Sequence, residues 1–347
     1  MYQFSRNLSM ETTDFARYLA IFFAKYLPSE RGASKNTIMA YRDTFVLLFQ
    51  YMEQKKNIKP HKMCLNDLGQ ATVIDFLNWL ETAKGNSAKS RNARLAAIRS
   101  FFDYLQYLEP ANVYECQKIK SIHVKRTEKK VMNYITVEGI KLLLKQPDQK
   151  TCRGRRDLAL IALMYDTGAR VQEIADLTVK NIRLSEPHTI TITGKGSKTR
   201  IVPMMKEQMK LLVQYMQENH LLEDKCKPMP LFFNARNEKL TRAGITYILQ
   251  KYVQNARAQD LSLIPDGVSC HSLRHSKAMH LLQAGVPLIY IRDLLGHESV
   301  VTTEVYARTD SLQKRKALEK AFEKVSDDPK PPSWQTNHQL LEWLKSL

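Results

Sequence analysis

The sequence predicts a mainly α-helical protein with one small β-hairpin or sheet, arranged as an N-terminal helical domain followed by a mixed α/β domain. Three observations predict this class. Apolar residues recur at helical spacing through most of the chain. A single stretch, residues 188–204, alternates isoleucine with threonine and turns through glycines. The length of 347 residues is too great for one small domain and suits two.

Three amphipathic helices are expected in the N-terminal part. The first covers residues 34–54, where Ser34 or Asn36 can cap its start. Its apolar stripe is Ile38, Tyr41, Phe45, Leu48 and Met52. The second covers residues 71–81 and the third residues 87–109. The inward residues of the third are Leu95, Ile98, Phe102 and Leu105.

The first turns of the third helix carry Lys89, Arg91 and Arg94, which we place on its outer face. Cations are unfavourable near a helix N-terminus, where the helix dipole is positive. A bound phosphate would reverse that cost, so these residues form either a solvated face or a contact to nucleic acid.

A basic linker is expected between the domains. The stretch KIKSIHVKRTEKK, residues 118–130, holds six Lys or Arg against one Glu and has no helical stripe. It either contacts a duplex, with Lys125 and Arg126 as candidates, or merely extends by self-repulsion. The predicted boundaries are a helical domain at 1–115, a linker at 116–133, a mixed α/β domain at 134–326 and a tail at 327–347.

The second domain reads as helices with one interruption. Helical patterns cover residues 136–146, 154–167 and 171–182. A β-hairpin follows at 188–204, with Gly194-Lys195-Gly196-Ser197 at its turn. The chain is then helical to about residue 325. In the tail, SDDPKPPS precedes a last amphipathic helix with Leu340, Leu341, Leu344 and Leu347.

The charge balance indicates a polyanionic partner. The chain has 53 basic and 35 acidic residues, a net charge of +18 and a pI near 9.6. The basic residues are spread over many segments, which favours nucleic acid over a membrane surface. Five scattered cysteines, no signal peptide and no apolar run of 18 residues predict a cytoplasmic protein without a disulfide framework or membrane span.

Four short stretches hold candidate reactive residues: GARVQEI, TGKGSKTR, HSLRH and LLGHESVVTTEVYAR. The candidates are Arg170, Glu173, Lys195, His271, Arg274, His297 and Tyr306. Each stretch alone has an ordinary explanation, such as an ion pair within one helical turn, a solvated turn or a core phenol. His271 and His275 have the spacing of two metal ligands on a helix, but no HExxH glutamate lies between them. We therefore expect no metal.

Taken together, these residues supply cations and hydrogen-bond donors around a phenol, without a catalytic carboxylate pair. Arginine forks bind phosphate oxygens, and preorganised donors stabilise a developing negative charge. Tyr306 is the candidate nucleophile for a phosphodiester. No cofactor is expected, and nearby cations should matter for activating the phenol, whose usual pKa is near 10.

The four stretches together resemble the tyrosine recombinases, the phage integrase family. Their order matches, and so does the spacing of 25 residues from Arg170 to Lys195, three from His271 to Arg274, and nine from His297 to Tyr306. The resemblance covers about residues 135–325. TIMAYRDTFVLLFQY and SRNARLAAIRSFFDYL resemble the helical core-binding domain of that family. The segments HSKAMHLL and YIRDLLGHESVVTTEVYAR, within residues 275–308, are similar to integrases carried on bacterial transposons.

The resemblance implies a role for each candidate. Tyr306 would attack the scissile phosphate to give a 3′-phosphotyrosyl bond and a free 5′-hydroxyl. Arg170 and Arg274 would bind the nonbridging oxygens, and Lys195 would protonate the leaving oxygen. His271 would assist proton transfer, His297 would hydrogen-bond the phosphate, and Glu173 would orient the site from behind.

The implied partners are double-stranded DNA with inverted-repeat core sites and further copies of the chain, as a tetramer on DNA. A related recombinase or accessory factor is a further candidate, and the protein would join the bacterial nucleoid when bound. Residues 310–325 or the Trp343 helix would dock on a neighbouring protomer or fold back on their own domain. The candidate DNA-binding residues are Lys35, Thr37, Lys89, Arg91, Arg94, Lys125, Arg126 and Lys277.

Two alternatives stay open on the residues. A type IB-like topoisomerase uses similar phosphotyrosine chemistry on one strand and relaxes supercoils instead of exchanging strands. A catalytically silent DNA-binding regulator would bind without forming a covalent adduct. The complete set from Arg170 to Tyr306 and the paired helical domain favour recombination.

Overall fold

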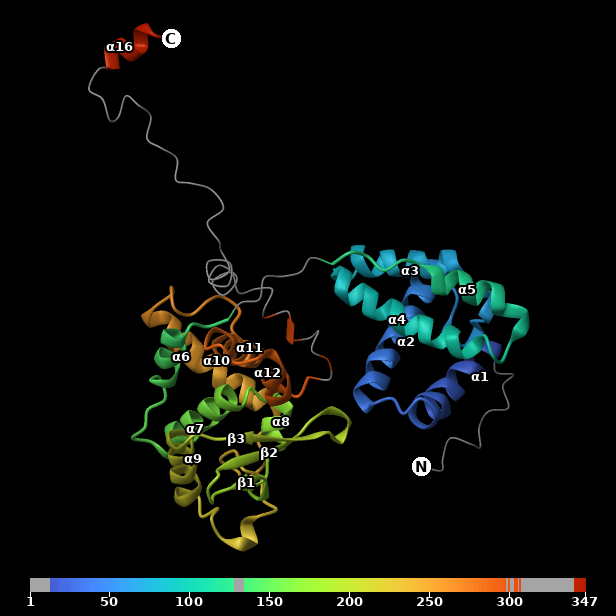
Figure 1. Cartoon of the computed structure of the whole chain (residues 1–347). Coiled ribbons are helices and arrows are strands. Elements are labelled where there is room, and N and C mark those ends of the chain that lie inside the picture. The colour runs from blue at the N-terminus through green and yellow to red at the C-terminus, as the bar shows by residue number, and fades with distance from the viewer. Residues whose placement is uncertain (1–12, 128–133, 298, 300–302, 305, 307–339) are drawn as a thin grey trace. The chain divides into compact units, whose positions relative to one another are not determined.

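The structure is a computed structural model that describes residues 13–127, 134–297, 299, 303, 304, 306 and 340–347 (Figure 1). The chain divides into two compact units, residues 1–130 and 131–347, and each is described by itself. The first is all helical and the second adds a small sheet to a helical framework. The predicted fold class is therefore confirmed.

The N-terminal unit is built from helices joined by short turns. Its α-helices are α1 (Asp14–Ile21), α2 (Lys35–Lys56), α3 (Gln70–Thr82), α4 (Ala88–Leu105) and α5 (Val113–Ser121). A π-helical segment, Phe22–Glu30, continues α1, and single 3-10 turns occur at Pro60–Lys62, Leu65–Asp67 and Pro110–Asn112. The three predicted helices are α2, α3 and α4, whereas α1 and α5 are additional.

The starts of α2 and α4 follow from their capping serines. The Ser34 hydroxyl accepts the backbone N–H of Thr37, and the Ser87 hydroxyl accepts that of Ser90. Of the two caps considered for α2, Ser34 is therefore the one used. All four residues predicted to face inward on α4 are buried, whereas Ile38 and Tyr41 of α2 are only half-buried.

Aromatic rings from different helices fill the core of this unit. Phe22 meets Phe101 edge to face with ring centroids 5.3 Å apart, and Phe45 meets Phe101 in the same way at 5.4 Å. Phe15 lies 5.6 Å from Phe101. Such edge-to-face contacts are the favoured geometry for aromatic pairs. Phe101 of α4 is thus the ring around which α1, the π-helical segment and α2 assemble.

Helix α5 takes residues 116–121 of the predicted linker into the N-terminal unit. Cys116 and Ile119, one helical turn apart, are buried, but Lys118 and Lys120 on either side of Ile119 obscured this apolar stripe in the sequence. Beyond α5, Asn92 of α4 fixes the chain at Lys125, because its side-chain amide forms two hydrogen bonds with the Lys125 backbone, at 2.8 and 3.0 Å. Residues 128–133 lie outside the described residues.

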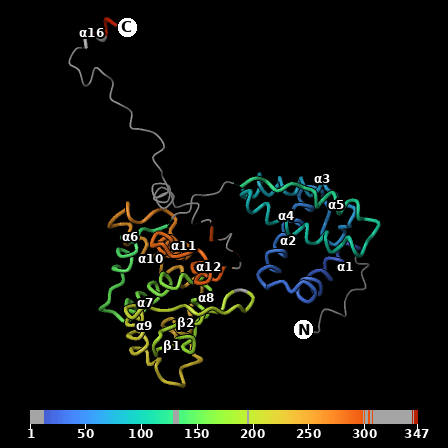
Figure 2. Tube along the Cα trace, in the orientation of Figure 1, coloured from blue at the N-terminus to red at the C-terminus, as the bar shows by residue number. Residues whose placement is uncertain are grey.

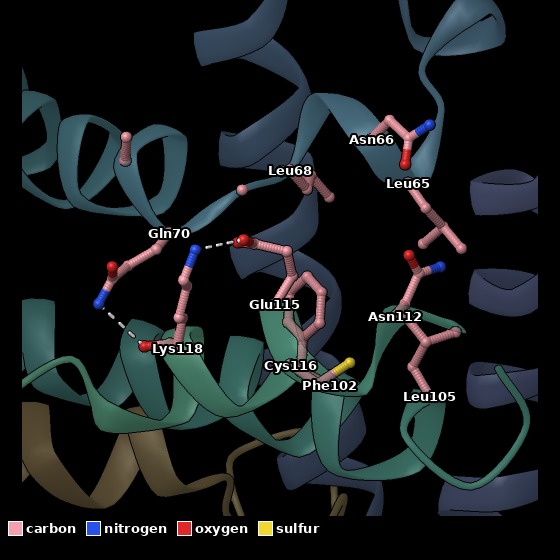
Figure 3. Close-up of a pocket in the computed structure, with 12 residues that line it drawn as sticks. Leu65, Asn66, Leu68, Gln70, Phe102, Leu105, Asn112, Glu115, Cys116 and Lys118 are labelled. Carbon is pink, nitrogen blue, oxygen red and sulfur yellow. Dashed lines mark hydrogen bonds and ion pairs between the residues drawn. The ribbon is translucent and has the colours of Figure 1, made fainter. Parts of the chain in front are cut away.

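A cavity of about 530 Å³ opens in this unit between the start of α3 and helices α4 and α5 (Figure 3). The Lys118 ammonium pairs with Glu115 at 2.7 Å, and Gln70 Nε2 donates to the Lys118 carbonyl at 3.1 Å. Most of the remaining lining is apolar, including Leu65, Leu68, Phe102 and Leu105. Gln70, Glu115 and Lys118 thus interact with one another, and none of the candidate reactive residues lines the cavity.

The second unit contains the predicted hairpin and a further strand. Its strands are β1 (Ile182–Arg183), β2 (Thr189–Thr193) and β3 (Thr199–Pro203), paired antiparallel in that order. Its helices are α6 (Val137–Leu144), α7 (Cys152–Thr167), α8 (Val171–Ala175), α9 (Lys206–Glu218), α10 (Arg242–Gln259), α11 (Cys270–Gln283), α12 (Leu288–Leu295) and α16 (Leu340–Lys345).

The register of the hairpin explains its buried face. Ile190 pairs with Val202, and both side chains are buried together with Ile192, whereas the threonines between them are half-buried or exposed. Period-two alternation of this kind is expected for a sheet with one face in the core. In Figure 2 the turn of the β2–β3 hairpin projects from the rest of the unit.

Four elements surround the candidate site. Helix α11 contacts α7 and α12, and α12 contacts β3. The α7–α8 turn, the hairpin and the end of α12 therefore meet around α11 (Figure 1). The tail forms helix α16 at Leu340–Lys345, inside the predicted amphipathic helix, while residues 310–325 lie outside the described residues. None of the described helices has the length and apolar character needed to cross a membrane.

Candidate active site

The α7–α8 turn presents Arg170. Gly168 ends α7 in the left-handed conformation, with φ of 55°, and Arg170 then caps the start of α8. The Arg170 guanidinium donates to Glu173 Oε1 at 2.8 Å, and the Arg170 backbone N–H donates to Glu173 Oε2 at 2.9 Å. Glu173 thus fixes both the main chain and the side chain of Arg170.

Arg274 of α11 is almost fully buried, with 1% of its surface exposed. Its guanidinium donates to the carbonyl oxygens of Gly168 at 2.8 Å and Leu295 at 2.7 Å. These two carbonyls belong to the ends of α7 and α12, where the helix dipole is negative and favours a cation. Burial and the neighbouring Arg170 lower the pKa of Arg274 to about 10, so it stays cationic at pH 7.

Arg200, which the sequence reasoning missed, is the second partner of Glu173. Its Nη2 donates to Glu173 Oε2 at 2.7 Å, and its Nε donates to the Leu294 carbonyl at 2.8 Å. Burial raises the pKa of Glu173, but the hydrogen bonds from Arg200 and Arg170 outweigh it, so the pKa lies below its usual value. The only sequence signal for Arg200 was its place in TGKGSKTR, where a hairpin arginine reads as solvated.

The hairpin that carries Lys195 begins against this carboxylate. A Cβ on Gly194 would lie 3.0 Å from Glu173 Oε1 and 3.8 Å from Arg170 Nη1, so glycine permits the close approach. Residues Lys195–Ser197 then form a single 3-10 turn. The side chain of Lys195 is outside the described part of the structure.

Tyr306 is buried in the site, with 2% of its surface exposed. Its hydroxyl and Nδ1 of His275 share a hydrogen bond of 2.9 Å. Burial raises the pKa of Tyr306, and Arg274 and Arg170 only partly oppose that shift. The cations expected to activate the phenol are therefore present, but burial dominates, and the phenol is protonated at neutral pH.

His297 also lies beside Tyr306, with the two rings parallel within 7° and their centroids 6.4 Å apart. Gly296, in the left-handed conformation, ends α12 just before it. Nδ1 of His297 shares a 3.0 Å hydrogen bond with the Thr303 hydroxyl. Burial and the two arginines lower the pKa of His297 to about 4. It is therefore a neutral hydrogen-bonding group at pH 7.

His271 lies next to His275, with ring centroids 4.7 Å apart and the rings at 73°. Burial, together with the charges of Arg274 and Arg170, lowers the pKa of His271. His275 was weighed in the sequence only as a metal ligand, and its contact with Tyr306 is a finding of the structure. In the part of the chain that the structure describes, no three His, Cys, Asp or Glu side chains gather as they would to hold a metal ion.

Five of the predicted residues thus lie close together in the structure. They interact directly, or through Gly296 and the ends of α7 and α12. These residues are Arg170, Glu173, Arg274, His297 and Tyr306. His271 borders this group and Gly194 brings the hairpin to it. Such a site offers two guanidinium groups, neutral imidazoles and a buried phenol to an oxyanion. It is suited to nucleophilic attack on a phosphodiester.

The structure contradicts the outer-face position predicted for Arg91, one of the candidate DNA-binding residues. Arg91 was assigned to the outer face of its helix, but it is buried, 4% exposed, with its Nε 3.7 Å from Glu81. Its neighbour Arg94 is half-buried and donates to the Ala40 carbonyl at 2.9 Å. A charged side chain at an apolar-facing position can extend along the core, which the sequence pattern does not distinguish from a solvated one.

The other candidates divide into exposed and paired residues. Lys35, Lys89 and Arg126 are exposed, and Thr37 is half-buried at the capped start of α2. Lys125 is exposed but forms a 2.6 Å ion pair with Glu81. Lys277 is mostly buried, 3.6 Å from the Asp166 carboxylate and over the ring of Tyr165. An internal partner therefore accounts for Lys277 without DNA.

Comparison with protein families gives two matches. The phage integrase family model matches residues 133–312, and the model of the phage integrase N-terminal SAM-like domain matches residues 21–107. The matched ranges lie one in each structural unit and together span most of the chain.

Individual proteins agree with these matches. The "Putative integrase/recombinase y4rC" of Sinorhizobium fredii is 35% identical over 332 residues, 96% of this chain and 98% of that protein. The tyrosine recombinase XerD of Listeria monocytogenes is 31% identical over 293 residues, 84% of this chain and 94% of that protein.

Two solved structures share the fold. The XerH site-specific recombinase bound to difH substrate is 24% identical, with a TM-score of 0.63 over 85% of this chain and 82% of that one. The Tn1549 transposon integrase in complex with transposon right end DNA is 15% identical, with a TM-score of 0.67 over 87% of this chain and 98% of that one.

Proposed function

The chain belongs to the phage integrase family of tyrosine recombinases, and on that premise we propose Tyr306 as the nucleophile with which it cleaves and rejoins DNA. The protein is a DNA strand-breaking and rejoining enzyme of this family. The observation that carries the assignment of Tyr306 is its burial among Arg170, Arg274 and His297. These are the groups that a phosphodiester would need around its reacting phosphorus.

The proposed reaction distributes roles over the site. The Tyr306 oxygen attacks phosphorus, forms a 3′-phosphotyrosyl ester and releases a 5′-hydroxyl. Arg170 and Arg274, which already donate to carboxylate and carbonyl oxygens, turn their remaining N–H groups toward the nonbridging oxygens. His297 hydrogen-bonds the phosphate as a neutral imidazole, and Lys195 gives the leaving oxygen its proton. Glu173 positions Arg170.

The phosphotyrosyl bond conserves the energy of the broken phosphodiester. A 5′-hydroxyl from another strand can therefore attack it, release Tyr306 and rejoin the DNA without a further energy source. Strand exchange between duplexes needs several active sites at once, so we propose that the protein works as a tetramer on inverted-repeat core sites. We propose integration or excision of a mobile element, or resolution, as its task, in the cytoplasm and on the nucleoid.

The C-terminal tail belongs to this proposed assembly. Leu344 of helix α16 and Leu347, two residues beyond its end, are exposed apolar side chains, 54% and 87% accessible. We propose that helix α16 docks on a neighbouring protomer of the tetramer. A related recombinase or accessory factor is a further proposed partner.

Covalent trapping tests the nucleophile. Nicked duplexes taken from the DNA that flanks the gene are incubated with the full chain, and denaturing electrophoresis detects protein joined to the 3′ end of the cleaved strand. The wild type should form this adduct, and the Tyr306→Phe variant should form none while it still binds the duplex. An adduct through a different side chain would refute the assignment. Binding without any adduct would favour a silent regulator, and supercoil relaxation without strand exchange would favour a topoisomerase.

A further inference from the structure

The Tyr306 hydroxyl has a partner that none of the roles above uses. Among the described residues, its one hydrogen bond is the 2.9 Å contact with Nδ1 of His275. The two side chains are 31 residues apart in sequence, and their rings lie 5.7 Å apart. His275 follows Arg274 on α11, so the helix that holds the buried arginine also holds the partner of the phenol.

The direction of this hydrogen bond follows from the charge states of the two groups. Burial raises the pKa of Tyr306, so the phenol keeps its proton and can donate it. Burial, His271 and Arg274 lower the pKa of His275 to about 4, so its imidazole is neutral at pH 7 and one ring nitrogen carries a lone pair. The phenol therefore donates to Nδ1, and the ring proton resides on Nε2.

Water is a poor competitor for the phenol proton. Tyr306 is 2% exposed, and the ring of His297 lies parallel to its ring with the centroids 6.4 Å apart. A proton that leaves the buried hydroxyl must pass to a group already in contact with it. Of the described side chains, His275 is the one in hydrogen-bonding contact.

We propose that His275 is a catalytic residue that orients the Tyr306 hydroxyl and takes up its proton during attack on the DNA phosphate. This inference rests on the proposed role of Tyr306. As the Tyr306 oxygen forms its bond to phosphorus, the O–H electron pair stays on that oxygen and the proton moves to His275 Nδ1. The bond from phosphorus to the 5′-oxygen breaks, and that oxygen receives a proton from Lys195. In rejoining, imidazolium returns its proton to the departing phenolate.

A bound phosphodiester should make His275 a stronger base. The phosphodiester brings a negative charge beside Arg170 and Arg274, whose positive charges disfavour protonation of the neighbouring histidines. Neutralising those charges makes His275 a stronger base only when substrate is in place. The nucleophile is thereby kept protonated until a phosphate is bound.

The decisive variant is His275→Asn in the full chain. The asparagine amide can place an oxygen near the position of Nδ1 and accept the phenol hydrogen bond, but it cannot take up a proton. On the nicked duplex that traps the wild type, we expect adduct formation to slow about 10²- to 10³-fold, the usual contribution of a general base. DNA affinity should change less than about twofold. A rate within about threefold of the wild type would overturn the proposal.

Helix α11 offers a matched control. His280 Nδ1 shares a 2.8 Å hydrogen bond with the Tyr165 hydroxyl, which repeats the histidine–tyrosine pair outside the reactive group. The His280→Asn variant should therefore form adduct at the wild-type rate. Equal losses in both variants would mean that the defect is one of α11 packing, and would overturn a specific role for His275.

A sulfur-substituted duplex distinguishes a proton transfer at the nucleophile from a proton transfer at the leaving group. Sulfur in place of the bridging 5′-oxygen leaves readily without a proton, because a thiol is far more acidic than an alcohol. This duplex should restore cleavage by Lys195→Ala and leave His275→Asn slow. Restoration of His275→Asn would place the histidine at the leaving group and refute the proposal. Absence of any adduct from the wild type would instead overturn the function of Tyr306 itself.

Discussion

At the scale of single residues, the site depends on buried charges that each have partners. Glu173 is 5% exposed and receives Arg170 and Arg200 on its two oxygens. Arg200 also donates to the Leu294 carbonyl, so one guanidinium joins β3, α8 and the end of α12. Arginine suits this position, because its rigid fork reaches two acceptors at once.

Arg200→Ala should destabilise the protein by about 3 kcal/mol, since removal of one partner leaves a buried charge less compensated. Arg200→Lys should fall between Ala and the wild type, because lysine keeps the charge but cannot reach both acceptors. Urea unfolding measures the loss, and adduct formation should fall in the same order.

The control for this experiment is Arg183→Ala, an exposed arginine on β1 of the same sheet. It should change stability by less than about 0.5 kcal/mol. Equal stability of Arg200→Ala and Arg183→Ala would contradict the role assigned to the buried guanidinium.

At the scale of elements, helix ends place the reactive groups. Gly168 ends α7 two residues before Arg170, and Gly296 ends α12 directly before His297, both in the left-handed conformation. The carbonyls at these two ends receive Arg274. Helix termination, which glycine makes possible, therefore also supplies the acceptors that hold the buried arginine.

The Gly168→Ala substitution should lower the free energy of unfolding by about 2 kcal/mol. An L-residue in the left-handed region loses about 1 kcal/mol or more, and a Cβ here would also lie 2.7 Å from Leu295 Cδ2. Displacement of this turn moves Arg170, so cleavage should slow as well. Thermal unfolding and covalent trapping give the two measurements.

The Gly267→Ala variant separates the cost of the left-handed conformation from the cost of the close contact with Leu295. Gly267 has a φ of 71°, but a Cβ there has no heavy atom within 4 Å. The Gly267→Ala variant should therefore lose only the conformational contribution to the free energy of unfolding, about 1 kcal/mol. If Gly168→Ala were no worse than Gly267→Ala, the close approach to Leu295 would be unimportant.

At the scale of the whole molecule, the charge of +18 should dominate the affinity for DNA. Protein cations release the counterions condensed on DNA when they bind phosphates, so affinity falls as salt rises. The exposed Lys89 and Arg126 belong to the N-terminal unit, as does the buried Arg91. Only the exposed cations are available for phosphates without a rearrangement of the core.

The double variant Lys89→Ala, Arg126→Ala should lower the slope of log affinity against log salt by about 2, near one unit for each phosphate that the protein no longer neutralises. Preference among DNA sequences should stay the same, because interactions with phosphates carry no sequence information. Fluorescence anisotropy over a salt series measures the slope. An unchanged slope would remove these two residues from the interface.

The sequence by itself determined the helices with regular stripes, the hairpin and most reactive residues. Periodicity and turn chemistry are local, so α2, α3, α4 and the β2–β3 hairpin could be predicted, while α5 was hidden by its lysines. The candidate reactive residues could be predicted for the same reason, because each of the four stretches is a local pattern.

Tertiary structure alone decided which charged and polar side chains meet. Arg91 is buried, Arg200 reaches Glu173 across 27 residues, and His275 reaches Tyr306 across 31. Neither burial nor such pairing follows from local pattern, because both arise only when α8, α11, α12 and β3 pack together. The same packing sets the protonation of the phenol and imidazoles, since it removes water and brings the arginines near.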